Sequence, residues 1–372
     1  MISLPHSYKI KYLLISIAYV FFLYLLYRHT GIITVNEAEK YIVASQEFLK
    51  GNIAYTFEHH LFYSSYVLFI TPFYALGGVI GVVIAQVVFN ILAAICLKKS
   101  IDLILPGNKV STLGSLIFLF SYPIQYWTLT LFSDNFFVCL ISICLYYTIK
   151  KKTMPEKIFW LFLLLIQVFS RPPGVFLSTV FGCYYLYTEK IVSTSRLWAL
   201  VVILFLFLFS ILFFIPVETS GYIKPIAAGA IIVNKPDYDV PEFNGLEKST
   251  LSAAYSYLFE HKGFSQTLGL YFRKLGSFFT LTRPYYSKLN NSILSLHYLL
   301  YFLAIGGLFL LRNKMQLLIF FLVVMLLIAN LTALTYNEWH YRFTLAIFPF
   351  LIVLSVLSFN YILTAVWPRM RK

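Results

Sequence analysis

The chain has little charge, and acidic residues are especially scarce. Charged residues make up only 12% of the 372 positions, with 15 acidic against 29 basic residues, while 60% are hydrophobic. A soluble domain of this length needs far more charge to cover its surface, so that class is excluded. The mean hydropathy of +0.79 instead indicates a polytopic membrane protein, with the lipid bilayer as its permanent partner.

Disulfide and metal-binding patterns are also lacking. The four cysteines all fall inside apolar segments, where a thiol behaves as a small hydrophobic side chain. His59 and His60 are adjacent, and neighbouring histidines rarely chelate one ion. We therefore expect no disulfide, no metal and no cofactor. The first apolar run has no small-residue cleavage site after it, so we expect an uncleaved anchor.

Long apolar runs are abundant. A membrane span needs about 20 mostly apolar residues. The spans that we expect cover residues 12–28, 78–97, 110–127, 134–149, 157–170, 173–188, 197–216, 294–311, 315–335 and 343–366. The run 61–77 is apolar too, but Pro72 and Gly77–Gly78 interrupt it, which favours a re-entrant or juxtamembrane segment.

The basic residues set the topology. The net charge of +14 sits at the ends of apolar runs, so we expect no nucleic acid partner. If 61–77 does not cross, the lysines at 98–99 and 150–152 and the basic C-terminus all face the cytoplasm. We therefore expect an all-α polytopic membrane protein with about ten transmembrane helices, outer juxtamembrane helices and both termini cytoplasmic. Its size favours a bacterial inner membrane, with the endoplasmic reticulum left open.

The chain divides into three parts on this topology. Residues 1–216 form an N-terminal transmembrane module with a first outer loop (29–61) and the re-entrant segment (61–77). Residues 217–293 form a long outer loop, with surface helices expected at 246–262 and 265–280, and residues 294–372 form the C-terminal transmembrane helices. No internal repeat is visible, unlike in inverted-repeat transporters.

The first outer loop carries the most informative residues. Asn36 is a suitable N-cap and Glu39 completes a capping box, so we expect an amphipathic helix over 37–50 that lies on the membrane. Glu37 stands at the start of this helix, at the membrane edge, which makes it a candidate general base. The competing interpretation is that an acid at a helix N-terminus simply complements the helix dipole.

Residues 37–52 resemble the first-loop signature of GT-C glycosyltransferases, the polyprenyl-phosphate-dependent family that includes protein mannosyltransferases and aminoarabinose transferases. The matching positions are Glu37, Tyr41, Ala44, Leu49 and Gly51, with Glu where Asp is commoner. The resemblance implies a lipid-linked sugar donor, a glycan, lipid or protein acceptor, Glu37 as the base and Tyr41 as a substrate-binding residue.

Two further patches resemble the same family. Residues 128–136 resemble its second acidic loop, which implies a catalytic or sugar-binding role for Asp134; an N-cap of the span 134–149 is the alternative. Residues 170–174 resemble a turn with a basic residue in the outer leaflet, which implies that Arg171 binds the donor phosphate. The alternative is that Arg171 snorkels or pairs with Asp134 or Glu338.

The remaining candidates come late in the chain. Residues 337–343 resemble the family's closing element. The resemblance assigns Arg342, Arg273 and Lys274 to the donor phosphate. We expect His60, Arg283, Glu338 and His340 to bind substrate. A basic face near lipid headgroups is the ordinary alternative for the long-loop cations.

The mechanism expected is inverting transfer, with Glu37 taking the proton of the acceptor hydroxyl on the periplasmic or lumenal side. Two other functions stay open. One is a lipid or small-molecule transporter or flippase, although the charges gather at the ends of spans rather than at mid-bilayer. The other is an O-antigen polymerase or ligase, which uses a pyrophosphate-linked donor.

Overall fold

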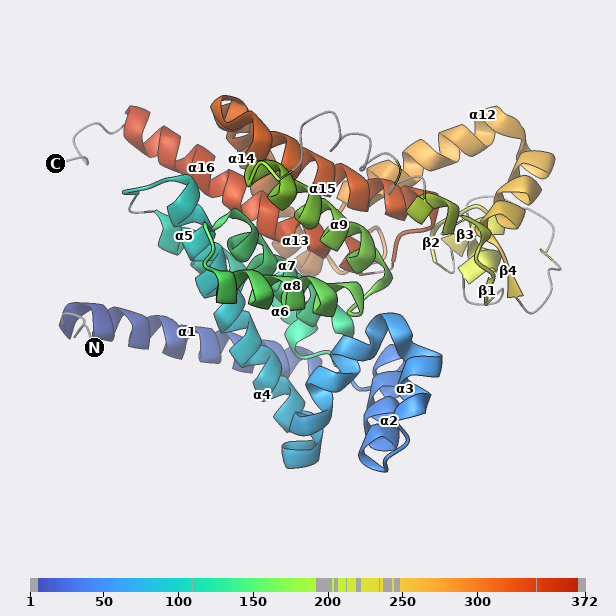
Figure 1. Ribbon diagram of the computed structural model, residues 1–372, viewed down its shortest axis with the longest axis horizontal. Helices are drawn as coiled ribbons and strands as arrows, with labels where there is room; N and C mark the ends of the chain where they lie inside the picture. Colours follow the sequence, from blue (N-terminus) through green and yellow to red (C-terminus); the bar gives the residue numbers. More distant parts are fainter. Residues whose placement is uncertain are drawn as a thin grey trace. The chain divides into compact units, whose positions relative to one another are not determined.

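The structure, a computed structural model, is predominantly helical (Figure 1). It describes residues 6–108, 110–191, 203, 207–211, 213–218, 222–233, 235–236, 243, 248–338 and 340–366, so half of the expected span 197–216 lies outside the described residues. Packing divides the chain into two units. Unit 1 comprises Met1–Val175, Leu300–Leu310 and Leu351–Lys372, and unit 2 comprises Phe176–Leu299 and Leu311–Phe350. The three-part division expected from the sequence stays a prediction.

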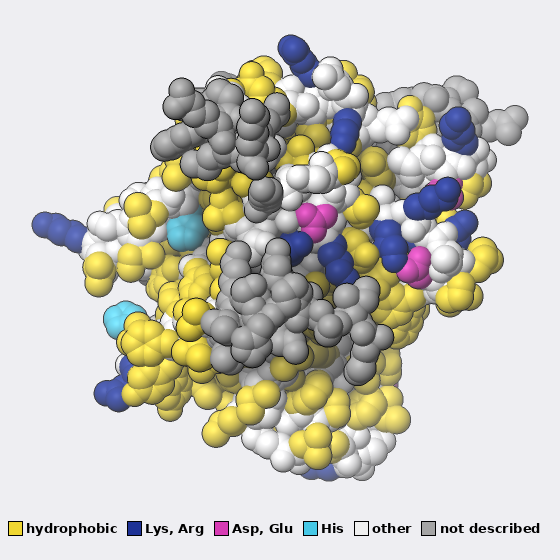
Figure 2. All heavy atoms as spheres, turned by 90° about the vertical axis from the view of Figure 1, so that its left-hand side faces the viewer, with side chains coloured by type: hydrophobic (Ala, Val, Ile, Leu, Met, Phe, Trp, Pro, Cys, Tyr) yellow, Lys and Arg dark blue, Asp and Glu magenta, His cyan; other side chains and the backbone are white. Residues whose placement is uncertain are grey.

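Three helical stretches of the described chain are long and apolar enough to cross a membrane, judged by length and composition. They are Ile53–Ile104, Lys288–Leu334 and Arg342–Ala365. Much of the face shown in Figure 2 is accordingly hydrophobic, with Lys and Arg side chains scattered over it. The expectation of a helical, membrane-embedded protein is confirmed, whereas the number of about ten crossings stays a prediction.

Unit 1 is built around α7, whose side chains are almost all buried. Its complete helices are α1 (His6–Thr30), α2 (Glu37–Leu49), α3 (Ile53–His60), α4 (Ser64–Ile104), α5 (Ser111–Phe120), α6 (Tyr122–Gln125), α7 (Ser133–Ile149) and α8 (Met154–Val168). Short 3-10 turns occupy Leu61–Tyr63 and Tyr126–Thr128, and most of α14 (Tyr298–Leu310) and α16 (Phe348–Val366) belongs to unit 1 as well. Helix α7 packs chiefly against α4 and α8.

The expected span 110–127 is wrong as a single helix. Helix α5 ends at Phe120, and Ser121 is extended (ψ 108°) before the short α6 begins. Pro123 explains the break, because proline lacks the backbone N–H and its ring clashes with the preceding helical turn.

Helix α4 folds back on itself (Figure 1). Gly77 and Gly78 leave the helical conformation, and Gly78 has φ 58° and ψ −145°. Residues with a Cβ rarely adopt this region of backbone conformation. The limbs 64–76 and 79–104 then pack together: the Tyr66 hydroxyl donates to Gln86 Oε1 at 3.3 Å, and the Phe69 and Phe89 rings lie 5.3 Å apart. The interruption seen in the sequence is therefore a helical reversal; whether it enters the bilayer stays a prediction.

Unit 2 combines helices with two small sheets. It holds most of α9 (Pro172–Thr188), then α11 (Lys224–Ala227), α12 (Leu251–Phe279), α13 (Lys288–Ser295) and α15 (Met315–Leu334), with 3-10 turns at Leu311–Lys314 and Arg342–Ile347. β1 (Val217–Glu218) pairs antiparallel with β4 (Lys248–Ser249), and β2 (Ala230–Ile232) with β3 (Lys235–Pro236). The expected all-α class holds, because these strands have only two or three residues each; the β1–β4 pair joins the start of the long loop to the residues just before α12.

Residues of the long loop share a small hydrophobic core with Tyr336, which follows α15. Its buried members are Ile223, Ile226, Ala227, Leu251, Ala254 and Tyr336. Two helices were expected at 246–262 and 265–280; the structure has α12, which turns at Gly263 (φ 72°, ψ 169°) between limbs 251–262 and 264–279. The expected boundaries at 262, 265 and 280 lie within one residue of the observed ones, whereas the expected start at 246 precedes Leu251. Gly263 allows the turn, because glycine adopts this conformation without strain.

Candidate functional site

In unit 1, backbone pairing brings the first outer loop beside α7. The Ile33 N–H donates to the Leu129 carbonyl at 2.9 Å, and the Leu131 N–H donates to the Ile33 carbonyl at 3.1 Å. The segment after α1 thus lies along the segment before α7. A third segment is tied in by the Ser65 N–H, which donates to the Phe169 carbonyl at 3.0 Å, just before Arg171.

Tyr41 links the first loop to the start of α7. Its hydroxyl donates to Glu37 Oε1 at 3.0 Å and lies 3.5 Å from Ser133 Oγ. Burial, and then the charge of Glu37, raise the pKa of Tyr41 well above its usual value. The phenol therefore stays protonated at neutral pH and can hold the Glu37 carboxylate in place. Glu37 itself is half-buried, whereas Glu39 is exposed.

The start of α2 differs from the expectation. Asn36 has φ 62° and its side chain makes no capping hydrogen bond, so the expected capping box is wrong; the Glu39 N–H instead donates to the Asn36 carbonyl at 3.2 Å. The buried side of α2 packs against α4 and α3 rather than lying open to a bilayer. Glu37 is thus positioned by packing of the helix and not by a cap.

Asp134 and Arg171 form a buried ion pair. Asp134 Oδ1 accepts from Arg171 Nη1, and the two side chains are only 1% and 5% exposed. This is one of the partners that the sequence left open for Arg171. The N-cap alternative for Asp134 is wrong, because Phe132 is the capping residue and Asp134 lies in the first turn of α7. Arg171 also lies near enough to Tyr41 to offset part of the rise in its pKa.

Aromatic rings border this group. The ring of Tyr41 lies 5.6 Å from that of Tyr63, 5.1 Å from that of Tyr66 and 6.3 Å from that of His60. His60, expected from the resemblance to bind substrate, therefore lies in the same region of unit 1. Glu37, Tyr41, Ser133, Asp134 and Arg171 are called the Glu37 cluster below.

A buried amide network supports the start of α7. The side-chain amides of Asn90 and Asn135 exchange hydrogen bonds of 3.2 and 3.1 Å, and both also donate to Thr128 Oγ1 at 3.0 Å. The Gln86 amide adds a bond of 2.9 Å to the Thr128 carbonyl. Because Asn135 follows Asp134 directly, this network fixes the backbone that carries the ion pair.

In unit 2, the closing element meets the turn that follows α12. Arg342 Nη2 lies 3.2 Å from Glu338 Oε1. The Tyr286 hydroxyl lies 3.4 Å from His340 Nδ1, with nearly parallel rings. Burial lowers the pKa of His340, which Arg342 also lowers and Glu338 raises. The imidazole is therefore mostly neutral near pH 7.

Two buried cations lie beside this element. Lys274 is 1% exposed and donates to the Thr335 carbonyl at 2.5 Å; Thr335 caps the C-terminus of α15, where positive charge is favourable. Arg283, 4% exposed, donates to the Ser277 carbonyl at 3.3 Å. That carbonyl also accepts from Asn337 at 2.9 Å, which ties both segments together.

The Arg342 cluster is defined by Lys274, Arg283, Glu338, His340 and Arg342. Arg273 differs from these residues, because it lies on an exposed face of α12. Trp339, between Glu338 and His340, lies outside the described residues. The structure thus gathers the candidates into two groups, one in each unit.

Three contributors were not predicted from the sequence. Ser133 contacts Tyr41, Tyr286 contacts His340, and Asn337 joins the closing element to α12. Each stands one residue before a candidate or three residues after one, so proximity along the chain is the only signal. Their partners are 54 to 92 residues away, which no local pattern can show.

Among the described residues, no group of three or more His, Cys, Asp or Glu side chains is placed to hold a metal ion. Comparison of the chain with protein-family models, curated proteins and solved structures gave no match.

Proposed function

We propose that the chain is a membrane glycosyltransferase of the GT-C kind. It moves a sugar from a polyprenyl-phosphate carrier to an acceptor hydroxyl on a glycan, lipid or protein, at the non-cytoplasmic face. The proposal includes about ten crossings, cytoplasmic termini and a bacterial inner membrane. The observation that carries it is the Glu37 cluster, in which a half-buried carboxylate held by a phenol lies near a buried carboxylate–arginine pair.

Glu37 suits the base better than Asp134 does. A carboxylate bound by arginine in a buried site strongly favours its charged form and is a poor proton acceptor. Asp134 is in that situation. Glu37 accepts a hydrogen bond from neutral Tyr41 and is more exposed. We assign proton acceptance to Glu37 and the orientation of Arg171 to Asp134.

The transfer then runs in one displacement. The acceptor oxygen attacks the anomeric carbon while its proton passes to Glu37. The bond from the anomeric carbon to the carrier's phosphate oxygen breaks, and its electron pair stays on that oxygen. The attack from the opposite side inverts the anomeric configuration. Arg171 stabilises the negative charge that grows on the leaving phosphate.

The Arg342 cluster, taken by itself, is a separate candidate for binding a phosphate group. Arginine binds phosphate oxygens bidentately, and Arg342 is partly exposed beside neutral His340 and Tyr286. Lys274 donates to the Thr335 carbonyl at the end of α15. Its role in this proposal is therefore to raise the local positive potential. Glu338, which pairs with Arg342, and Arg283, which binds the Ser277 carbonyl, orient the substrate in this proposal.

A transporter or flippase is the main rival. It needs polar groups that line a path through the bilayer. The polar side chains inside unit 1, such as Gln86, Asn90 and Asn135, are fully buried and bond to one another and to Thr128. A closed network of this kind supports a rigid scaffold more than a path.

The test compares two neighbouring carboxylates. Glu37→Gln and its matched control Glu39→Gln lie on the same helix, two residues apart, and each removes one charge. Cells that lack the protein are supplied with the parent chain or either variant at equal membrane levels, and their lipids and glycans are compared by mass spectrometry. We expect loss of Glu37 to lower turnover about 10²- to 10⁴-fold, so the missing sugar returns only with the parent and Glu39→Gln.

Two results would overturn the proposal. One is full restoration by Glu37→Gln. The other is an unchanged lipid and glycan profile in deficient cells, together with movement of labelled undecaprenyl phosphate across vesicles by the reconstituted protein. The choice of donor distinguishes a polymerase or ligase from the proposed enzyme. A polymerase or ligase requires the pyrophosphate-linked carrier in the same reconstituted membranes.

A further inference from the structure

The second limb of α12, residues 264–279, has three distinct faces. Phe264, Leu268 and Phe272, spaced four residues apart, are 70%, 42% and 58% exposed. The side buried against the protein carries Thr267, Leu270, Lys274 and Phe278. A third side is exposed and polar or small, with Ser265, Gln266 and Arg273. A surface helix in water needs only the buried and the polar face, so the exposed apolar face requires an explanation.

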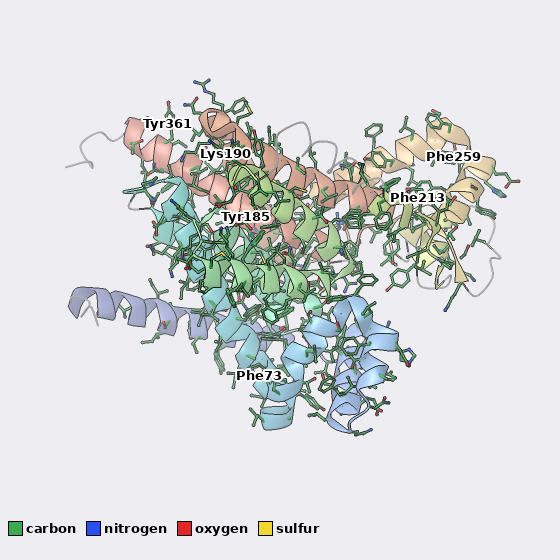
Figure 3. All side chains as sticks on the ribbon, in the orientation of Figure 1. Phe73, Tyr185, Lys190, Phe213, Phe259 and Tyr361 are labelled. Carbon is green, nitrogen blue, oxygen red and sulfur yellow. The ribbon has the colours of Figure 1, made fainter. Side chains whose placement is uncertain are left out.

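The apolar face continues around the turn at Gly263. Phe259, at the end of the first limb, is 42% exposed, and its ring stacks on that of Phe264 at 6.1 Å with an interplanar angle of 17°. Phe259 lies on α12 close to the turn (Figure 3). Four large apolar side chains, here called the α12 ladder (Phe259, Phe264, Leu268 and Phe272), therefore follow one another on the outside of α12.

The ladder borders a membrane-spanning candidate. The Tyr271 hydroxyl donates to Asn330 Oδ1 of α15, and Lys274 binds the carbonyl at the end of that helix. Helix α15 belongs to the apolar stretch Lys288–Leu334. One turn before Asn330, Leu326 is 53% exposed, as expected for a lipid-facing side chain. The ladder thus continues the lipid-facing surface of α15 at its C-terminal end.

We infer that the second limb of α12 is an interfacial helix whose ladder inserts into the lipid leaflet at the C-terminal end of α15. The acyl chains cover Phe259, Phe264, Leu268 and Phe272, and Arg273 on the polar face meets the headgroups. Three observations select lipid as the occupant. The ladder adjoins a helix that is long and apolar enough to span a membrane, the polar face of α12 lies next to the ladder on the same helix, and Lys262 and Arg273 suit anionic headgroups.

The inference is tested by spin-label accessibility. The four native cysteines are replaced by alanine or serine, and single labels are placed by Phe264→Cys, Leu268→Cys and Phe272→Cys. Matched controls on the polar face are Gln266→Cys and Arg273→Cys. The protein is placed, one copy per disc, in nanodiscs of phosphatidylcholine and phosphatidylglycerol. We expect the ladder labels to collide with oxygen severalfold more, relative to a water-soluble nickel complex, than the control labels do.

A second measurement keeps the native cysteines. Phe264→Trp is compared with Gln266→Trp in vesicles that contain brominated phosphatidylcholine. We expect the added tryptophan fluorescence to be quenched at position 264 and not at 266. Equal access of the nickel complex to both faces, or equal quenching at 264 and 266, would show that water surrounds the α12 ladder. Dipolar broadening between ladder labels in discs with two copies, without lipid contact, would show that a second chain covers it instead; either result overturns the inference.

Discussion

The two clusters of candidate residues differ in charge and in burial. The Glu37 cluster holds two carboxylates and one guanidinium, and its ion pair is almost fully buried. The Arg342 cluster holds three cations and one carboxylate, and its ion pair is 11% and 21% exposed. A carboxylate beside a neutral phenol suits proton acceptance, whereas gathered cations suit an anion. The contrast therefore favours proton acceptance for the Glu37 cluster and anion binding for the Arg342 cluster, each considered by itself.

The buried pair of unit 1 should be the more costly to break. Arg171→Met leaves Asp134 buried without its cation, which we expect to lower the free energy of unfolding by about 3–5 kcal/mol. Arg342→Met, at the more exposed pair, should cost about 1 kcal/mol or less. Unfolding by SDS titration, followed by circular dichroism, measures both.

A double variant sharpens this first prediction. Because an apolar pair can replace a buried ion pair with little loss, Asp134→Leu together with Arg171→Met should recover most of the stability lost by Arg171→Met alone. Equal losses for Arg171→Met and Arg342→Met would remove the contrast between the clusters.

Phosphate binding should show the opposite ranking. Arg342→Ala removes a charged hydrogen-bond donor, so we expect about 10- to 100-fold weaker binding of undecaprenyl phosphate. Glu37→Gln should leave this affinity nearly unchanged, because the base acts on the acceptor. Titration of both purified variants by native mass spectrometry measures the ratio. If Glu37→Gln weakened the binding of undecaprenyl phosphate and Arg342→Ala did not, the assignment would be reversed.

Two glycines extend the comparison to the backbone. Gly78→Ala should destabilise unit 1 by about 1–3 kcal/mol, since φ 58° with ψ −145° is strained for alanine. Gly182→Ala, inside α9 in unit 2, has open space at its Cβ position and should stabilise by about 0.5–1 kcal/mol. Thermal unfolding in detergent distinguishes the signs, and a loss of stability at both positions would contradict the contrast in backbone conformation.

Local features of the fold were readable from the sequence. Apolar length predicted α7, α9 and α15 closely, because such runs have few other ways to satisfy their backbone. Gly77 and Gly78 predicted the interruption at 77–78, and the two helices expected in the long loop were separated at 263–264, whereas the break before Pro123 was missed. The strand pairs of the long loop were missed, since each strand has only two or three residues and carries no periodic pattern.

The candidate sites were readable only in part. The acidic and basic residues stood out because charge is rare in this chain. The pairing of Arg171 with Asp134 was one of several possibilities, and the contact of Tyr41 with Ser133 was not foreseen. The Tyr41–Ser133 contact accompanies the backbone pairing of Ile33 with Leu129 and Leu131, and such long-range register is not encoded in any local pattern.

The smallest expected effect concerns pH. Burial lowers the pKa of His340 below its usual value near 6.5, so below that value the folded protein binds fewer protons here than the unfolded chain. The stability that neutral His340 contributes is complete above about pH 6.5 and is lost as the pH falls toward the folded pKa. His340→Gln should therefore reduce the fall in melting temperature between about pH 7 and pH 5. An unchanged fall would mean that the pKa of His340 is the same in the folded and unfolded chain, which contradicts the effect of its burial.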